Sequence, residues 1–441
     1  MVTIDIYGSS DVHAHWKFPS GVSGNDNSPI SGGLARIQSF AHGIDRSRSL
    51  VIDNGDTFNG SALATFLENA RHDAEPLLQA IEDIAYDAMV PGNHDFDFGL
   101  ARLEEFNQRL GNPMLCANLF RAVEKDSPTS VFVPYRIFEK AGIRIAVIGL
   151  ITAATQQLSN YENVRDVHFA DVVESLKPLI AALRPEVDLL ILSYHGGLER
   201  DLQSGQPTQY NTGEDESWRI LSQLPGIDGL ISGHQHRLAS GMFHADGRET
   251  AYVQPGYAGQ ILGKLSFEFV DGQLVSRSAE LLDLAQQPGT GESLNTGVLD
   301  AVTDDLESWL DTSCPLSSSA ICDYFSDRLH IDAVLLALPH EPSWRDLRTA
   351  LQSPYQVQTL RLPAAEFALG LKALQNADLS VFGQNLPLQP LAEGLGGDYR
   401  FAANVAATQY FPRSRVEYLQ VINFFDELVR LAYRGQAWGS V

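Results

Sequence analysis

The stretch Pro91-Gly92-Asn93-His94-Asp95-Phe96-Asp97 decides how the rest of this chain is interpreted. It follows a short apolar run at residues 88–90 and gathers amide, imidazole and carboxylate groups at what the pattern predicts to be the end of a strand. Such groups would lack hydrogen-bond partners inside an apolar layer. Taken alone, an ordinary polar turn rich in Gly, Asn and Asp explains the stretch. The alternative is that these groups meet a substrate or a metal, and the other strand ends decide between the two.

Four further apolar runs, at residues 2–7, 50–52, 187–192 and 227–231, also end in side chains that can bind metals. Together with Asn93 and His94, these side chains are Asp11, His13, Asp56, His195, His234 and His236. Continuous apolar strands separated by helices predict an α/β sheet that is covered on both faces. Loops at the carboxyl ends of such strands gather along one edge of the sheet. Residues far apart in the sequence are therefore expected to converge.

A shared metal site explains the pattern better than separate turns. Each group alone is weak evidence, since Asp-x-His triplets and Gly-His-x-His turns also occur in surface loops without function. Two divalent cations roughly 3.5–4 Å apart can clamp a phosphoryl group and acidify a bridging water into a nucleophile. A carboxylate must hold both ions, and Asp56 is the candidate. Imidazoles suit Zn²⁺, Fe or Mn²⁺.

The composition limits the class of protein. A length of 441 residues predicts two or three domains. The net charge of −24, from 55 acidic against 31 basic residues, disfavours binding to a nucleic-acid polymer. A bound metal would offset this field near an anionic substrate. The apolar runs are far too short for a membrane span.

The cysteines and the first residues predict a cytoplasmic location. Cys116, Cys314 and Cys322 are too sparse for a disulfide framework, which fits a reducing compartment. Residues 1–7 enter the first predicted strand with no basic and apolar leader before it. If a leader has been removed from this sequence, the expectation changes to a secreted protein.

Five short motifs resemble those of the calcineurin-like metallophosphoesterases. They are Asp11-Val-His13, Gly55-Asp56, Gly92-Asn93-His94-Asp95, His195-Gly196 and Gly233-His234-Gln-His236. The longer runs from Asp56 to Ser61 and from His94 to Gly99 are similar to the branch of 5′-nucleotidases and 2′,3′-cyclic-nucleotide phosphodiesterases. The resemblance covers residues 1 to about 275. It implies an α/β fold in which an N-terminal αββα sandwich carries the metals and a smaller C-terminal α+β domain, like that of 5′-nucleotidases, binds the substrate.

The resemblance also implies a role for each matched residue. The first metal would be bound by Asp11, His13 and His236, and the second by Asn93, His195 and His234, with Asp56 bridging the two. His94 would stabilise the phosphoryl charge or protonate the leaving oxygen, and Asp97 would orient His94. The cofactors would be two divalent ions, Mn²⁺, Zn²⁺ or Fe. His236 stands where some relatives carry an amide, which leaves the preferred metal open.

A shift in composition between residues 276 and 295 predicts a domain boundary. We expect the catalytic domain at residues 1–275, a linker with a connecting helix at 276–314, and a divergent substrate-binding domain at 315–441. Two glycine-rich motifs that the family carries in its second domain are absent from their usual places. Phe382, Tyr399 and Phe401 are candidates for stacking on a substrate, but a role in the hydrophobic core is preferred for them.

The expected function is dimetal-dependent hydrolysis of a phosphoester in a small, nucleotide-like metabolite, by in-line attack of a metal-bridging hydroxide. This activity would make the protein a 5′-nucleotidase-like phosphatase. The alternatives are a 2′,3′-cyclic-nucleotide phosphodiesterase or nucleotide-diphosphate hydrolase and, more distantly, a non-catalytic nucleotide-binding protein. The expected partner is a small phosphorylated metabolite, with neither a nucleic-acid polymer nor a membrane, and the sequence leaves the oligomeric state open.

Overall fold

A computed structural model describes residues 1–19, 30–122, 129–210, 212–287 and 297–317, and shorter stretches beyond residue 317. The chain divides into two compact units. The first consists of Met1–Ala64 and Ala74–Leu299, and the second of Thr65–Asp73 and Asp300–Val441. The division into residues 1–275, 276–314 and 315–441 stays a prediction.

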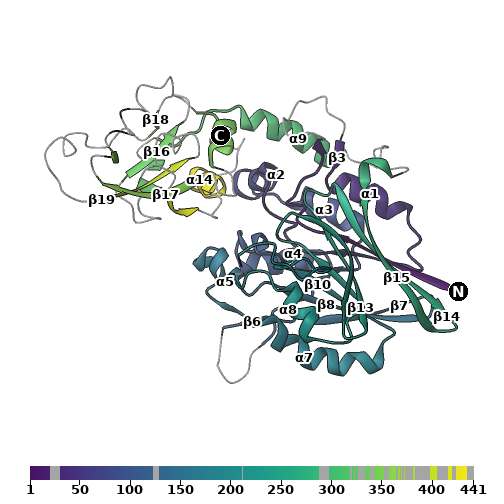
Figure 1. The fold of residues 1–441 in the computed structure, drawn as a ribbon. Coiled ribbons are helices and arrows are strands. Elements are labelled where there is room, and N and C mark those ends of the chain that lie inside the picture. The colour runs from purple at the N-terminus through teal and green to yellow at the C-terminus, as the bar shows by residue number, and fades with distance from the viewer. Residues whose placement is uncertain are drawn as a thin grey trace. The chain divides into compact units, whose positions relative to one another are not determined.

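The first unit is built on two sheets (Figure 1). One sheet has the strand order β15 (Gln273–Asp283), β14 (Ile261–Val270), β1 (Val2–Ser9), β4 (Ser49–Asp53) and β5 (Ala88–Met89). The other has the order β12 (Leu238–Ala245), β13 (Arg248–Pro255), β11 (Gly229–Ser232), β10 (Leu189–His195), β8 (Ile143–Ile151) and β7 (Tyr135–Lys140). Strands β1, β4 and β5 are parallel, as are β8, β10, β11 and β13. The carboxyl ends of neighbouring parallel strands therefore lie along one edge of each sheet.

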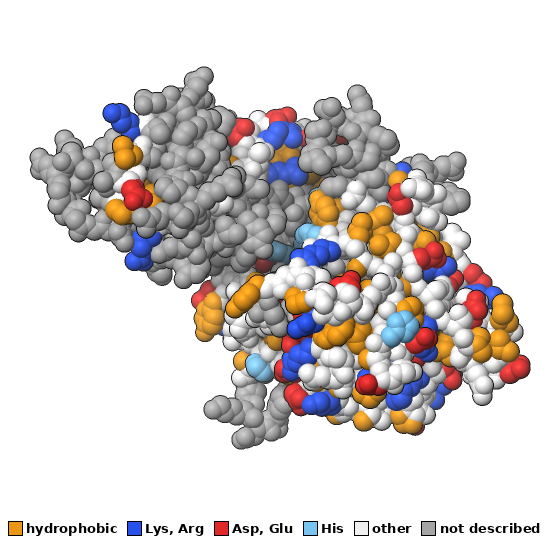
Figure 2. Space-filling model, viewed as in Figure 1, with side chains coloured by type: hydrophobic (Ala, Val, Ile, Leu, Met, Phe, Trp, Pro, Cys, Tyr) orange, Lys and Arg blue, Asp and Glu red, His pale blue; other side chains and the backbone are white. Residues whose placement is uncertain are grey.

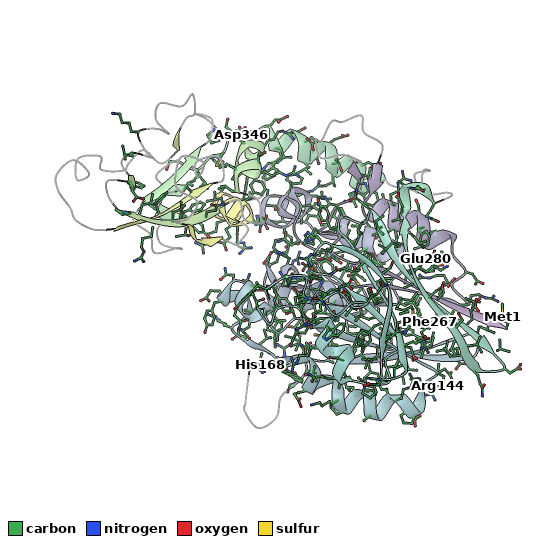
Figure 3. The ribbon with its side chains drawn as sticks, viewed as in Figure 1. Met1, Arg144, His168, Phe267, Glu280 and Asp346 are labelled. Carbon is green, nitrogen blue, oxygen red and sulfur yellow. The ribbon has the colours of Figure 1, made fainter. Side chains whose placement is uncertain are left out.

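Alternation along the strands explains why they are apolar throughout. Successive side chains of a strand point to opposite faces of the sheet. In β8, Ile145 and Val147 belong to a core that also contains Ile4 and Phe267 of the other sheet. Phe267, labelled in Figure 3, is fully buried there. The two sheets thus pack face to face around this core.

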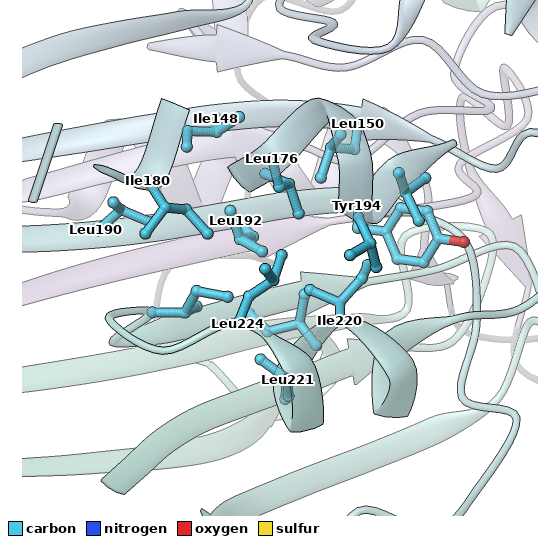
Figure 4. Close-up of a cluster of buried hydrophobic side chains, with 14 of the residues drawn as sticks. Ile148, Leu150, Leu176, Ile180, Leu190, Leu192, Tyr194, Ile220, Leu221 and Leu224 are labelled. Carbon is cyan, nitrogen blue, oxygen red and sulfur yellow. The ribbon is translucent and has the colours of Figure 1, made fainter. Parts of the chain in front are cut away.

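Helices cover the outer faces of both sheets. Beside β8 and β10, α7 (Val172–Leu183) and α8 (Ser217–Gln223) bury leucine and isoleucine side chains against the strands (Figure 4). On the other sheet, the ring of Tyr7 in β1 packs 5.0 Å from that of Phe40 in α1 (Leu34–Gly43), and α3 (Glu75–Ile84) packs beside α1. The other described α-helices with residues in this unit are α2 (Ala62–Thr65), whose last residue belongs to the second unit, α4 (Leu100–Arg109), α5 (Thr155–Leu158) and α6 (Tyr161–Val164). The expected αββα sandwich is confirmed.

Strand β15 runs past residue 275, where the sequence predicted a change of domain. It pairs with β14 along the edge of the first sheet, from Gln273 to Asp283. Its side chains alternate between exposed and half-buried positions. In this edge strand polar residues stand among the apolar ones, so the composition changes at residue 276 although the sheet continues.

The second unit combines a sheet with helices, as expected of an α+β domain. Its described strands have the order β18 (Val381–Phe382), β16 (Ala333–Ala337), β19 (Asp398–Asn404), β17 (Val357–Pro363) and β20 (Val416–Leu419). Its described helices include α9 (Gly297–Leu310), α11 (Trp344–Leu351) and α14 (Phe424–Ala432). The rings of Trp309 and Trp344 stack 5.5 Å apart, and that of Phe425 lies 6.1 Å from Trp309.

The segment Thr65–Asp73, which contains helix η1 (Phe66–Arg71), belongs to this second core although it comes from the first part of the chain. The ring of Phe66 is fully buried 5.2 Å from that of Trp309. The hydroxyl of Thr65 donates a hydrogen bond to Asp426, and the guanidinium of Arg71 lies 3.1 Å from a carboxylate oxygen of Asp305. The segment is therefore part of the second unit's packing.

The surface shows no basic stripe on the face seen in Figure 2, where described acidic and basic side chains are interspersed. Within the described ranges, no helix is both long and apolar enough to cross a bilayer. The cytoplasmic location stays a prediction.

Candidate metal centre

The predicted ligands all lie on loops that follow parallel strands of the first unit. Asp11 and His13 follow β1, Asp56 follows β4, Asn93 follows β5, His195 ends β10, and His234 and His236 follow β11. Backbone hydrogen bonds join these loops within the first sheet and to the second, where the N–H of Ala258, after β13, donates to the carbonyl of Asp11 at 2.8 Å. The N–H of Asp11 donates to the carbonyl of Gly55 at 2.9 Å, and that of His13 donates to the carbonyl of Asp56 at 2.8 Å. The loops therefore form one structure.

The backbone is strained at many of these positions. Asp11, His13, Asp56, His234 and His236 have φ angles between +52° and +69°. Residues other than glycine rarely adopt this left-handed backbone conformation. It costs about 1–3 kcal/mol per residue and persists only where the surroundings enforce it. A turn selected only for shape would place glycine there. The presence of aspartate and histidine in spite of this cost indicates that the side chains themselves are needed at these positions.

Asp11, His13 and His236 form the first cluster, with one potential ligand atom from each lying within 4.8 Å of the others. The Nδ1 of His13 is 2.7 Å from the carbonyl oxygen of Asn59, so Nδ1 carries the proton and Nε2 carries the lone pair. That Nε2 lies 3.0 Å from Nε2 of His236, which is itself 3.5 Å from Oδ1 of Asp11. Burial lowers the pKa of His13 well below its usual value, which keeps the ring neutral. Neutral imidazole is the form that binds metal.

Asp56, His195 and His234 form the second cluster, again with ligand atoms within 4.8 Å of one another. The Nδ1 of His195 donates to the carbonyl oxygen of Asn54 at 2.7 Å. Its Nε2 lies 3.3 Å from Oδ2 of Asp56 and 3.3 Å from the amide oxygen of Asn93. His195 is completely buried. Two oxygen ligands and two imidazoles thus surround one point.

Asp56 stands between the two clusters. Its Oδ1 accepts a hydrogen bond from the backbone N–H of His94 at 2.7 Å. Its Oδ2 is 3.3 Å from Nε2 of His195 and 3.9 Å from Nε2 of His13. A single carboxylate oxygen therefore faces both clusters, which is the arrangement that a bridging ligand needs.

His94 lies beside the clusters and is held by a carboxylate. Its Nδ1 is 2.9 Å from Oδ2 of Asp97, which also accepts a hydrogen bond from the side-chain amide of Asn59 at 3.0 Å. Burial opposes a charge on this ring, but Asp97 and Asp56 outweigh it and raise the pKa of His94 to about 10. The other ring nitrogen, Nε2, is left for the reaction.

Asp95 holds two of the loops together. Its carboxylate accepts hydrogen bonds from the backbone N–H groups of Asp56, Thr57 and Phe58, each at 2.9 Å, and of Gly92 at 2.8 Å. Asp95 thereby fixes the loop after β4 to the loop after β5. Its place in the motif is explained by this role, without a contact to metal.

The donor set fits divalent cations. Asp11 and Asp56 lie within ion-pair distance of histidines, and both carboxylates are buried. Buried carboxylates need charge compensation. Carboxylate and amide oxygens combined with imidazole nitrogens are a set that first-row divalent metals accept. The structure thus brings together all seven predicted ligands, with His94 and Asp97 beside them, while metal binding itself stays a prediction.

The structure describes the side chain of one of the three aromatic residues predicted to stack on a substrate. The ring of Phe401 in β19 is completely buried and packs 4.8 Å from that of Phe367, as expected of a core residue. Phe382 lies in β18 and Tyr399 in β19, but their side chains are outside the described part of the structure. A role for these residues in binding a substrate stays a prediction.

Several residues that support the site did not stand out in the sequence. Asn54 and Asn59 hold ligand histidines through main-chain carbonyls, which carry no signal in the side chain, although the side-chain amide of Asn59 also donates to Asp97. Tyr257 stacks on His236 with ring centres 5.1 Å apart, and Glu214 lies 2.7 Å from His234. Both come from loops that no motif marks. Of these four residues, only Asn59 lies in one of the motif runs of the sequence, the run from Asp56 to Ser61.

Comparisons with known proteins agree with this geometry. A family model described as calcineurin-like phosphoesterase matches residues 4–238. A 5′-nucleotidase of Vibrio cholerae is 31% identical over 250 residues, which are 53% of this chain and 43% of that protein. Protein UshA of Yersinia enterocolitica is 29% identical over 305 residues, which are 64% of this chain and 52% of that protein. The chain thus spans about half the length of the curated relatives it matches.

A solved structure extends the likeness of fold to the whole chain. It is that of a Staphylococcus aureus protein, described as a 5′-nucleotidase in complex with α-ketoglutarate, and it aligns with a TM-score of 0.71 at 23% identity. The alignment covers 100% of this chain and 98% of that one. Because the match to the family model covers more than half of the residues, the chain belongs to the calcineurin-like phosphoesterase family.

Proposed function

We propose that the protein is a dimetal phosphoester hydrolase acting on a small, nucleotide-like phosphate ester. The observation that carries the proposal is the position of Oδ2 of Asp56, which faces His195 and His13 at the junction of the two clusters. Asp11, His13 and His236 would hold one divalent ion, and Asn93, His195 and His234 the other. Mn²⁺, Zn²⁺ and Fe all suit this set. When bound, such ions supply Lewis acidity and a nucleophile at neutral pH.

The residues of the chain position the ester and manage its charge. His94 donates from Nδ1 to Asp97, so its Nε2 faces away from this carboxylate and is available to the phosphoryl group or the leaving oxygen. Asn59 holds both Asp97 and His13, and so couples the position of the acid to that of a ligand. Asp95 keeps the loops in place before substrate arrives. A preorganised site of this kind lowers the barrier because little rearrangement remains.

The substrate class rests on the relatives. Those at about 30% identity are called 5′-nucleotidase and UshA, which favours a nucleotide-like monoester here. The test uses metal-stripped protein to which Mn²⁺ or Zn²⁺ is restored, assayed with p-nitrophenyl phosphate, bis-p-nitrophenyl phosphate, nucleoside monophosphates and 2′,3′-cyclic nucleotides. We expect hydrolysis of monoesters that a chelator abolishes.

The other outcomes separate the alternatives. Faster turnover of diesters than of monoesters would replace the proposal with a phosphodiesterase. Binding of two metal ions without hydrolysis of any ester would support a non-catalytic nucleotide-binding protein instead.

A further inference from the structure

Glu214 contacts a predicted ligand from a loop that no motif marks. It lies between β10 and α8, and its Oε1 is 2.7 Å from Nε2 of His234. The side chain of His234 is 10% exposed and that of Glu214 is 32% exposed. The contact therefore lies at the rim of the second cluster, partly shielded from water.

We propose that Glu214 is a positioning residue that fixes the tautomer and orientation of His234 for binding the second divalent ion. This inference rests on the proposed function, because it assumes that the second cluster binds a metal. A carboxylate only accepts hydrogen bonds, so the neutral His234 ring places its one proton on Nε2 and donates it to Glu214. The lone pair that a metal requires is then on Nδ1.

His13 and His195, the two buried ligand histidines, have the opposite arrangement. His13 and His195 donate from Nδ1 to the main-chain carbonyls of Asn59 and Asn54, so each presents Nε2 to its cluster. His234 differs from both because the carboxylate at its Nε2 comes from Glu214, which is not one of the predicted ligands, whereas Nε2 of His195 and of His13 faces Asp56. Without Glu214, the proton of its ring could move to Nδ1, which would remove the donor atom from the second cluster.

The loop that carries Glu214 is held by a buried polar network. Asp215 accepts a hydrogen bond from the backbone N–H of Gly197 at 2.6 Å and another from Nε2 of Gln235 at 2.8 Å. Gln235 also accepts one from the N–H of Leu198 at 2.9 Å. The main-chain carbonyl of Glu214 accepts a hydrogen bond from the hydroxyl of Thr152 at 2.5 Å. Glu214 is thus held at the second cluster from both sides.

Gln235, the middle residue of the His-x-His motif, belongs to this network. It stands between His234 and His236, yet its side chain joins the loop at residues 197–215 instead of either cluster. The His-x-His motif thus presents two ligands and anchors, through its middle residue, the loop whose carboxylate orients one of them. Because this network fixes the position of Glu214, the contact between Glu214 and His234 can orient the imidazole ring. An exposed ion pair without such support would contribute little by itself.

The test measures metal binding and not turnover. Metal-free wild-type, Glu214→Ala and Glu214→Gln proteins are titrated with Zn²⁺ in competition with a chelator of known affinity. Loss of a carboxylate that orients a ligand histidine typically weakens metal affinity about 10- to 100-fold. We expect that loss for the second ion in Glu214→Ala, and a smaller loss in Glu214→Gln because its amide oxygen can still accept the hydrogen bond from Nε2. The first ion should be unaffected and the melting temperature of the metal-free protein unchanged.

Glu249→Gln is the matched control. Glu249 lies 3.6 Å from Nδ1 of the exposed His244, which belongs to neither cluster. We expect this variant to bind both ions as the wild type does. Equal affinity of Glu214→Ala and wild type for both ions would overturn the inference and leave the proposed function intact.

A second measurement is made on the wild type, so it tests the inference even where a Glu214 variant fails to fold. In the ¹⁵N-histidine spectrum of zinc-loaded wild type, with His234 assigned through His234→Ala, we expect a proton on Nε2 of His234 and metal on Nδ1. Metal on Nε2 would overturn the inference. Two ions bound in this way without hydrolysis of any ester would contradict the proposed function alone, whereas wild type that binds no second ion would contradict both.

Discussion

Asp56 is the side chain on which both candidate metal sites depend. One of its oxygens is held by the backbone of His94, and the other faces the two clusters. Its positive φ of 53° shows that the loop adopts a strained conformation to place it there. The residue could be predicted because it ends an apolar run in a motif, whereas its exact partners depended on contacts between distant loops.

Asp56→Asn should abolish the proposed hydrolysis while leaving the fold intact. The amide keeps the shape of the carboxylate but removes the charge that holds two cations together. We expect kcat/KM to fall at least about 100-fold, since even indirect partners of metal ligands have effects of that size. Measurement of bound metal per chain should show fewer than two ions. Asp45→Asn, at an exposed aspartate that interacts with Ser47 and Arg48, is the control and should behave as wild type.

Asp97→Asn tests the second role predicted for the opening stretch. Asp97 accepts hydrogen bonds from the ring of His94 and from the amide of Asn59. An asparagine in its place leaves His94 poorly oriented, so we expect kcat to fall by about 10- to 100-fold while metal content stays at the wild-type level. Steady-state kinetics and metal analysis on the same samples check this. An unchanged kcat would show that His94 needs no carboxylate partner.

At the level of elements, the loops after the strands pack against one another in van der Waals contact. A Cβ atom on Gly92 would lie 2.2 Å from Oδ1 of Asp56, and one on Gly60 would lie 2.2 Å from Nδ1 of His13. These positions must stay free of side chains because ligands from other loops occupy the space. The close approach is a property of the folded loops and could not be predicted from either loop alone.

Gly92→Ala should therefore damage the site by moving a loop. The added methyl group collides with Asp56, so we expect weaker metal binding and a loss of activity similar to that of Asp56→Asn. Gly43→Ala is the matched control. A Cβ atom there meets nothing within 4 Å, and alanine restricts the unfolded chain, so this variant should be as stable as wild type or more stable by up to about 1 kcal/mol. Activity and thermal unfolding of the two variants would be compared, and full activity of Gly92→Ala would contradict the packing described.

The pattern of apolar residues predicted the buried strands well and the exposed ones poorly. Strands such as β8 and β10 are covered on both faces, so their sequences are apolar without interruption. Strand β15 lies at an edge with many exposed side chains, and its sequence predicted a linker. The site followed from the strands that could be recognised, because the ligands come at the ends of buried strands.

At the scale of the whole molecule, the second unit is completed by residues from the first part of the chain. The sequence of residues 65–73 does not indicate which core this segment joins. In the structure, Phe66 packs against Trp309, with Trp344 and Phe425 around the same tryptophan. The N-terminal sequence therefore contributes to the stability of the C-terminal unit.

Phe66→Ala should destabilise the second unit. Removing a fully buried phenylalanine typically costs about 3–5 kcal/mol. We expect the fluorescence of Trp309 and Trp344 to report unfolding at a lower temperature or denaturant concentration than in wild type. Leu369→Ala, at a side chain that is 71% exposed, is the control and should unfold as wild type does. Equal midpoints for Phe66→Ala and wild type would show that the segment does not contribute to this core.

The membership of Thr65–Asp73 in the second unit limits how such a gene can be rearranged. The chain passes between the units at residues 64/65, 73/74 and 299/300. A single recombination event near residue 300 would bring in a foreign C-terminal half while leaving behind the short helix that completes its core. Exchange of C-terminal halves between relatives would thus require matching changes in two separate places in the gene, so the halves are expected to diverge together instead of being shuffled as independent modules.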